Sequence, residues 1–178
     1  MKFNFSNSRL IRRAAIGSAI LIGAIALTGC STLTTNQYEA TAKTTYTWQV
    51  KYSRDLTSSK TPRFETFTST SVVNRNGIKP AGGVKGPDER GLWWPPLPPR
   101  PTVDEVEQRK RPQEEATAPE LVKSVEYQLR YQAGDRQRTL PTNYQVYRQV
   151  VKAYPQQIPL QLTLGINDNS VEKAEPLN

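Results

Sequence analysis

The side chains able to do covalent or acid–base chemistry are few in this chain of 178 residues. It has no histidine and one cysteine, Cys30. The lack of imidazole excludes His-dependent triads, His metal ligation and imidazole acid–base catalysis. The 16 Asp and Glu residues leave the paired-carboxylate chemistry that glycosidases use. None of them stands at a predicted strand end among aromatic and polar neighbours. We therefore predict no enzyme, no catalytic residue, no metal ligand and no cofactor.

One acidic group, Asp104, Glu105 and Glu107, has a simpler explanation than catalysis or metal binding. Thr102 and Glu105 have the spacing of a capping box, in which each side chain bonds to the backbone at a helix start. The acids then suit the positive end of the helix dipole, and the basic residues 109–111 suit its other end. The spacing predicts a short helix over residues 102–111.

Cys30 lies at the end of an apolar N-terminal run. The basic residues Lys2, Arg9, Arg12 and Arg13 precede residues 14–27, which are aliphatic or small apart from one serine. A basic start, an apolar centre and small residues before a cut site are typical of a secretory signal peptide. The run is shorter than the roughly 20 residues that span a bilayer. We predict a signal peptide over residues 1–29.

The four residues Leu27-Thr28-Gly29-Cys30 resemble the lipobox of bacterial lipoprotein precursors. The resemblance implies that a signal peptidase recognises Leu27, Thr28 and Gly29, that Cys30 carries a diacylglyceryl thioether, and that its new amino group is acylated, for instance with palmitate. Several acyl chains give essentially permanent membrane attachment. Two alternatives remain open: an uncleaved signal anchor, and a buried apolar helix. Lipidation leaves no thiol for a disulfide, a nucleophile or a metal site.

The same leader changes the expected location and charge. It holds four of the 24 basic residues and none of the 16 acidic ones, so the mature chain has a net charge of +4 instead of +8. Outside the cytoplasm we expect no nucleic-acid partner; anionic lipid headgroups or wall polymers suit the charge better. Ser31, in place of Asp, favours the outer membrane over the inner one under the usual sorting rule, with the domain facing the periplasm.

The mature chain is predicted to have three parts. Residues 30–45, the lipidated cysteine and a Thr-rich stretch without a clear period, are interpreted as a flexible tether of roughly 20 Å. Residues 46–166 form a single β-rich domain, and residues 167–178 form a polar tail. Period-two alternation or β-branched composition predicts strands at 46–52, 63–73, 125–131, 136–140 and 160–166.

Residues 77–119 interrupt this domain as a long Gly/Pro-rich insertion. Its residues 91–101 predict an extended polyproline II segment. Trp93, Trp94, Pro95, Pro98 and Arg100 make it the candidate interaction surface. Pro95, Pro98 and Arg100 match the form that SH3 domains bind, but we favour a segment that lies across the domain, with a tryptophan packed on the sheet. An exposed aromatic pair that contacts sugars or the membrane interface is the other alternative.

Residues 142–154 decide the fold class. As a strand, Arg148 and Lys152 would share a face with apolar residues. As a helix, the apolar residues share one face, with Asn143 as cap and Pro155 as terminator, so we favour helix. The predicted fold is α+β and mainly β: a small antiparallel sheet of four or five strands with one packed helix. An all-β sandwich is the alternative.

Two functions fit these features. The first is a non-catalytic lipoprotein that binds or scaffolds an envelope protein partner at the membrane surface. The second is an envelope carbohydrate-binding protein or carboxylate-based hydrolase that uses Trp93, Trp94 and Trp48.

Overall fold

The computed structural model describes residues 31–55, 62–81 and 84–177. The lipobox residues Leu27, Thr28, Gly29 and Cys30 lie outside the described residues. Across the described ranges, no helix is both long and apolar enough to cross a membrane.

The fold is α+β and mainly β, as predicted, with one sheet and one substantial helix. The sheet has eight strands among the described residues, in the order β1-β7-β8-β6-β5-β2-β3, and β4 pairs with β2. All pairs are antiparallel except one contact between β6 and β8. The strands are β1 (Thr32–Thr35), β2 (Tyr38–Ser53), β3 (Arg63–Arg75), β4 (Glu115–Ala116), β5 (Glu120–Ala133), β6 (Arg136–Thr142), β7 (Leu160–Leu164) and β8 (Val171–Pro176). The helices are α1 (Val103–Gln108) and α2 (Tyr144–Ala153), with 3₁₀ turns η1 (Tyr154–Gln156) and η2 (Ile166–Asp168). The all-β sandwich is therefore wrong.

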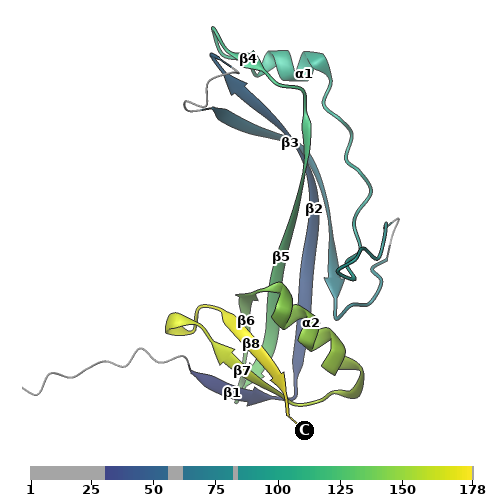
Figure 1. Cartoon of the computed structure of the whole chain (residues 1–178), viewed down its shortest axis with the longest axis vertical. Coiled ribbons are helices and arrows are strands. Elements are labelled where there is room, and N and C mark those ends of the chain that lie inside the picture. The colour runs from purple at the N-terminus through teal and green to yellow at the C-terminus, as the bar shows by residue number, and fades with distance from the viewer. Residues whose placement is uncertain (1–30, 56–61, 82–83, 178) are drawn as a thin grey trace, which may run out of the picture.

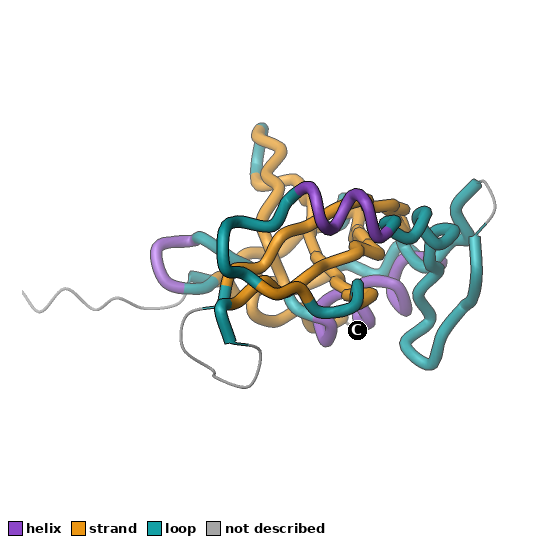
Figure 2. The backbone as a smooth tube through the Cα atoms, turned by 90° about the horizontal axis from the view of Figure 1, so that it is seen from above, coloured by secondary structure: helices purple, strands orange, loops and turns teal. Residues whose placement is uncertain are grey.

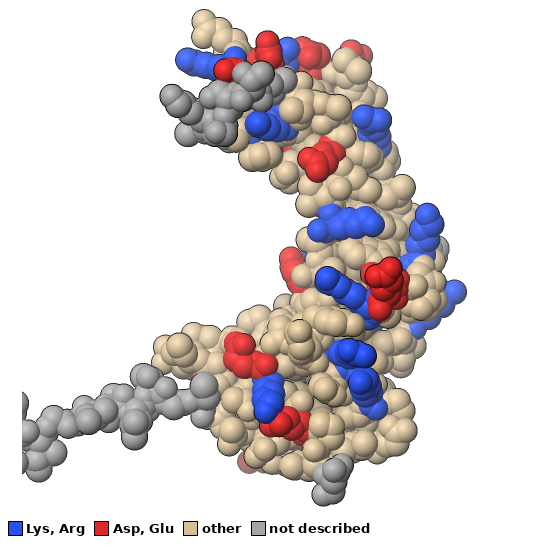
Figure 3. All heavy atoms as spheres, in the orientation of Figure 1, with Lys and Arg blue, Asp and Glu red and all other residues tan. Residues whose placement is uncertain are grey.

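The three longest strands, β2, β3 and β5, form an arm that rises from a smaller base (Figure 1). The base contains β1, β6, β7, β8, α2 and the adjoining ends of β2 and β5. The arm curves, so the whole molecule is C-shaped and hollowed on one side, with basic and acidic side chains interspersed over the face that Figure 3 shows. Because β2 pairs with β5 from Tyr38↔Tyr131 to Gln49↔Glu120, base and arm share one hydrogen-bonded ladder.

The helix interpretation of residues 142–154 is confirmed, and α2 fills the core of the base. Its buried residues are Val146, Tyr147, Val150 and Ala153, which recur at the spacing of one helix face. They pack with Leu129, Leu160, Leu162 and Leu164 of the strands. The Asn143 side chain caps the helix by accepting a hydrogen bond from the Val146 N–H at 3.0 Å, and Pro155 lies in the turn that follows.

The predicted tether over residues 30–45 is wrong for its described part, residues 31–45. Those residues form β1 and the first half of β2, so the domain begins well before residue 46. The missed signal is an alternation of small side chains: Ala40, Ala42 and Thr44 are fully buried, with Tyr38 and Tyr46 continuing the same face. Ala and Thr carry little hydrophobicity, but they bring the strand close to what packs on it.

The predicted polar tail over residues 167–178 is also wrong where the structure describes it. Residues 171–176 form β8, which pairs with β7, and only Val171 and Ala174 of this strand are buried. β7 ends at Leu164 instead of residue 166, because the chain turns at η2. These added strands explain why the sheet exceeds the four or five strands expected.

The insertion over residues 77–119 contains one short helix and one two-residue strand. The capping box of α1 is confirmed, with the Thr102 and Glu105 side chains each bonded to the other residue's backbone, although the helix ends at Gln108. Tyr52 donates to the Val106 carbonyl at 2.9 Å and so fixes α1 to the far end of the arm. There the hydrogen bond from Arg63 to Glu114 lowers the pKa of Glu114 to about 2.

The packing of α2 makes a matched test of the core. Val150→Ala in α2 should lower the free energy of unfolding by about 2 kcal/mol, because Val150 is fully buried. Val103→Ala in α1 is the control; that side chain is 77% exposed, and the change should stay within about 0.5 kcal/mol. Urea unfolding followed by circular dichroism measures both. Equal effects would contradict the placement of α2.

Candidate binding groove beside the proline-rich segment

One buried side chain, Asn74 of β3, holds the start of the proline-rich segment on the arm. Its amide donates to the Trp93 carbonyl and to the Ala42 carbonyl, both at 3.0 Å. Its side-chain oxygen accepts from the Trp93 N–H at 2.7 Å. Thr44 of β2 also donates to the Trp93 carbonyl, at 2.7 Å. Both backbone polar groups of Trp93 are therefore fixed by side chains of two neighbouring strands.

The rest of the segment is held by further bonds to its carbonyl groups. The Trp48 indole donates to the Pro98 carbonyl at 3.0 Å, and Thr70 and Thr68 donate to those of Pro96 and Pro99, each at 2.6 Å. Pro95 and Pro98 are buried. The segment thus lies across the sheet, the arrangement that the sequence favoured. The two prolines that an SH3 domain would need are not exposed to a partner.

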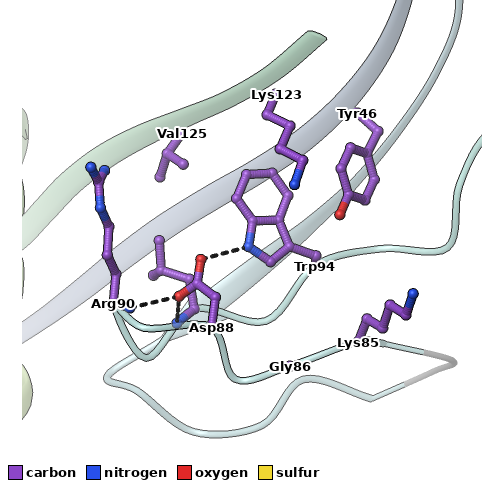
Figure 4. Close-up of a pocket in the computed structure, with 9 residues that line it drawn as sticks. Tyr46, Lys85, Gly86, Asp88, Arg90, Trp94, Lys123 and Val125 are labelled. Atoms are coloured by element: carbon purple, nitrogen blue, oxygen red, sulfur yellow. Dashed lines mark hydrogen bonds between the residues drawn. The ribbon is translucent and has the colours of Figure 1, made fainter. Parts of the chain in front are cut away.

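A turn over residues 85–94 builds the wall of a groove next to this segment (Figure 4). Lys85 and Trp94 pair through their backbones, with N–H to carbonyl distances of 2.8 and 2.7 Å. Gly86 has φ +130°, and a Cβ there would lie 2.8 Å from the Leu92 carbonyl oxygen, so the turn requires glycine. Leu92 is fully buried and joins the main core.

Asp88 closes this turn through both carboxylate oxygens. One accepts from the N–H groups of Arg90 and Leu92 at 2.9 Å, and the other accepts from the Trp94 indole at 2.8 Å. Burial opposes ionisation of this carboxyl, but the three hydrogen bonds together outweigh it and lower its pKa below the usual value. Asp88 is therefore a charged structural acceptor whose oxygens already have partners.

The groove consists of two adjoining cavities that share three residues, Tyr46, Lys85 and Lys123. We call it the Trp94 groove. The first cavity, of about 510 Å³, is lined in addition by Gly86, Asp88, Arg90, Leu92, Trp94 and Val125. The second, of about 540 Å³, is lined in addition by Pro95, Pro96, Leu97 and Leu121. Lys85 and Lys123 thus face both cavities; the first cavity adds the charged residues Asp88 and Arg90, and the second adds apolar residues alone.

An aromatic pair capped by a cation lines the groove. The Tyr46 and Trp94 rings lie 5.0 Å apart between centroids, and the Lys123 ammonium lies 5.6 and 5.5 Å from them. Figure 4 shows Lys123 and Tyr46 beside the Trp94 ring, with Asp88 at the indole nitrogen. Lys123, Lys85 and Arg90 give the lining three cationic groups against one carboxylate, which suits an anionic ligand group.

The structure separates the residues of the predicted interaction surface. Trp94 and Pro95 line the groove, whereas Trp93 is held by its backbone and its ring lies 5.1 Å from the Lys79 ammonium. Pro98 is buried, and the exposed Arg100 lies over Trp48 at 5.6 Å. The lipidation and recognition residues Cys30, Leu27, Thr28 and Gly29 lie outside the described part of the chain.

Sequence reasoning missed the basic residues of the groove. Lys123 is the one with a readable signal, because period two in β5 places it on the same face as Leu121 and Val125. A charged residue on an otherwise apolar face of a strand is a candidate binding residue. Lys85 and Arg90 come from the turn and carry no such signal. Among the described residues, no group of three or more His, Cys, Asp or Glu side chains is placed to hold a metal ion.

Comparisons of the chain with protein-family models, with curated proteins and with solved structures gave no match.

The role of Asn74 can be tested directly. Asn74→Ala removes three hydrogen bonds of a fully buried side chain and leaves the Trp93 N–H without that acceptor, so the free energy of unfolding should fall by about 2–3 kcal/mol. The tryptophan emission should also shift to the red as the segment loosens. Asn36→Ala, at an exposed position between β1 and β2, is the control. An unchanged emission spectrum in Asn74→Ala would contradict the role assigned to this side chain.

Proposed function

We propose that the protein is a lipid-anchored, non-catalytic binding protein of the bacterial envelope, and that the Trp94 groove receives an anionic group of a protein partner. The lipobox resemblance at Leu27-Thr28-Gly29-Cys30 supports the anchor and the extracytoplasmic location. The observation that supports the binding role is the groove itself, whose walls are held in place by hydrogen bonds within the protein.

Preorganisation is the main support for this proposal. One wall of the groove belongs to β2 and β5, and the other is the turn that Asp88 and Asn74 hold in place. A partner that enters need not order these elements, so more of the contact energy remains for affinity. Lys85, Arg90 and Lys123 favour a carboxylate or phosphate, and the apolar residues of the second cavity favour a neighbouring aliphatic or aromatic group. A peptide with an acidic residue beside an apolar one offers both.

An envelope carbohydrate-binding protein or hydrolase is the second candidate, because Trp94 and Tyr46 are residue types that stack on sugar rings. Two features of the groove speak for the first candidate. The Lys123 ammonium already lies near the faces of both rings, where a sugar would stack. Asp88, the carboxylate of the groove lining, has a lowered pKa, whereas a general acid for glycoside cleavage needs a raised one.

The anchor has its own test. Cells fed radiolabelled palmitate should label the wild-type protein and leave Cys30→Ala unlabelled, because the thioether forms on the only cysteine. The Cys30→Ala protein should also leave the membrane fraction or remain as the uncleaved precursor. Label that persists in Cys30→Ala would overturn the lipoprotein proposal.

The groove is tested by reversing one charge. Lys123→Glu should weaken capture of the envelope partner at least about fivefold in pull-downs from detergent-solubilised envelopes, since it removes the central cation. Lys43→Glu is the matched control, because this exposed residue of β2 lies on the opposite face of the sheet. Loss of capture in Lys43→Glu alone would place the partner on the other face and contradict the groove.

The glycan alternative has a separate readout. Titration with peptidoglycan fragments should leave the tryptophan emission unchanged if the partner is a protein. A saturable change in emission that Trp94→Ala abolishes would favour the carbohydrate-binding candidate.

A further inference from the structure

The residue that follows Cys30 belongs to the folded base. The Ser31 carbonyl accepts a hydrogen bond from the Leu164 N–H at 2.8 Å, and the Ser31 hydroxyl donates to the Asp168 carboxylate. β1 begins at the next residue, Thr32, and pairs with β7 through Thr35. Ser31 is thus fixed from two sides by the strand end and by the η2 turn.

This position leaves no flexible chain between an anchor at Cys30 and the sheet. One residue spans at most about 3.6 Å, so lipid chains on Cys30 would enter the bilayer within one residue's reach of Ser31. The base cannot stand away from the membrane under that constraint. The surface around Ser31 therefore lies at the lipid headgroups, and its residues determine how the base contacts the membrane.

The neighbouring surface is the η2 turn, and its first residue is a large exposed apolar side chain. Ile166 is 68% exposed, although Leu164 two residues earlier is buried. The turn is closed by hydrogen bonds from Gly165 N–H to the Ser170 carbonyl and from Asp168 N–H to the Gly165 carbonyl, both at 3.0 Å. These bonds hold the backbone that presents Ile166 to solvent.

Two carboxylates lie beside Ile166: Asp168 is paired with a cation, whereas the exposed Glu172 accepts a hydrogen bond from the Ser170 hydroxyl. The Asp168 carboxylate accepts from Ser31, and Arg138 lies 3.9 Å from it and donates to the Asp168 carbonyl at 3.2 Å. The Asp168 side chain is thus accompanied by a cation where the turn meets anionic headgroups. An isolated carboxylate there would be repelled, whereas this pair is close to neutral.

We infer that the η2 turn is a membrane-contact site, in which Ile166 inserts into the lipid interface beside the anchor at Cys30. This inference rests on the lipid anchoring proposed above. The anchor makes the contact intramolecular, so one apolar side chain can add a second contact point that restricts how the base tilts on the bilayer. The arm and the Trp94 groove would then move over a narrower range of directions from the membrane than a flexible tether allows.

The test places an environment-sensitive dye at Ile166. In lipidated full-length protein the thiol of Cys30 is consumed, so the cysteine of Ile166→Cys is the one thiol that the dye NBD can label. After reconstitution into phosphatidylethanolamine/phosphatidylglycerol vesicles, the emission of this dye should shift to the blue. Spin-labelled lipid should quench it about twofold. Val103→Cys is the matched control, because Val103 is also an exposed aliphatic residue, at 77%, but lies in α1 at the far end of the arm.

A variant with a longer linker tests whether the short connection to Cys30 holds Ile166 at the membrane. Ten Gly/Ser residues inserted between Cys30 and Ser31 would allow the base to move about 16–19 Å from the anchor, and quenching at position 166 should fall towards that at position 103. Palmitate labelling of each variant reports the anchor independently. Label without quenching at position 166 would overturn the membrane-contact site and leave the anchor intact. Absence of label would overturn the anchor itself.

Discussion

The burial of the Asn74 side chain is the constraint on which the rest of the structure depends. This amide is fully buried between two strands and the proline-rich segment, and such a group is costly unless its hydrogen bonds are made. Its bonds to Ala42 and Trp93 satisfy it and fix the segment at the same time. Leu92 then enters the main core on one side, and Trp94 lines the groove on the other. A neighbouring amide, Asn76, similarly ties the end of β3 to Ala40 by accepting from its N–H at 2.8 Å.

The elements that could be predicted from the sequence are those with a strong local signal. α2 combined an apolar face with a cap at Asn143 and a proline after its end, so three independent signals agreed. The predicted parts of β2 and β5 carried period-two alternation with large side chains, and β3 was rich in β-branched and aromatic residues. β1, the first half of β2 and β8 were missed because their buried residues are small or few, as Ala40, Ala42 and Ala174 illustrate. Their place is set by tertiary packing under α2 and against β7, which no short window of sequence contains.

The groove could be predicted only in part for a related reason. Trp94 and Pro95 stood out by type, but Tyr46, Lys85 and Lys123 come from three separate stretches of the chain. Their meeting depends on the register of β2 against β5, which pairs Tyr46 with Lys123, and on the turn that Asp88 closes. The sequence indicated which residue types were available, whereas the register decided which of them share a surface.

The continuity of β2 also sets a length. Tyr38 lies in the core of the base and Tyr46 in the groove, eight residues later on the same strand, which corresponds to about 26 Å of extended chain. Figure 2 views the molecule along this direction and shows loops that extend to one side of the strands. Matched insertions of two residues in β2 and in the strands paired with it would move the groove about 7 Å further from the base and keep its side chains on the same face, whereas single-residue insertions would turn them to the other face. The distance between the base and the Trp94 groove can therefore change during evolution in steps of two residues per strand.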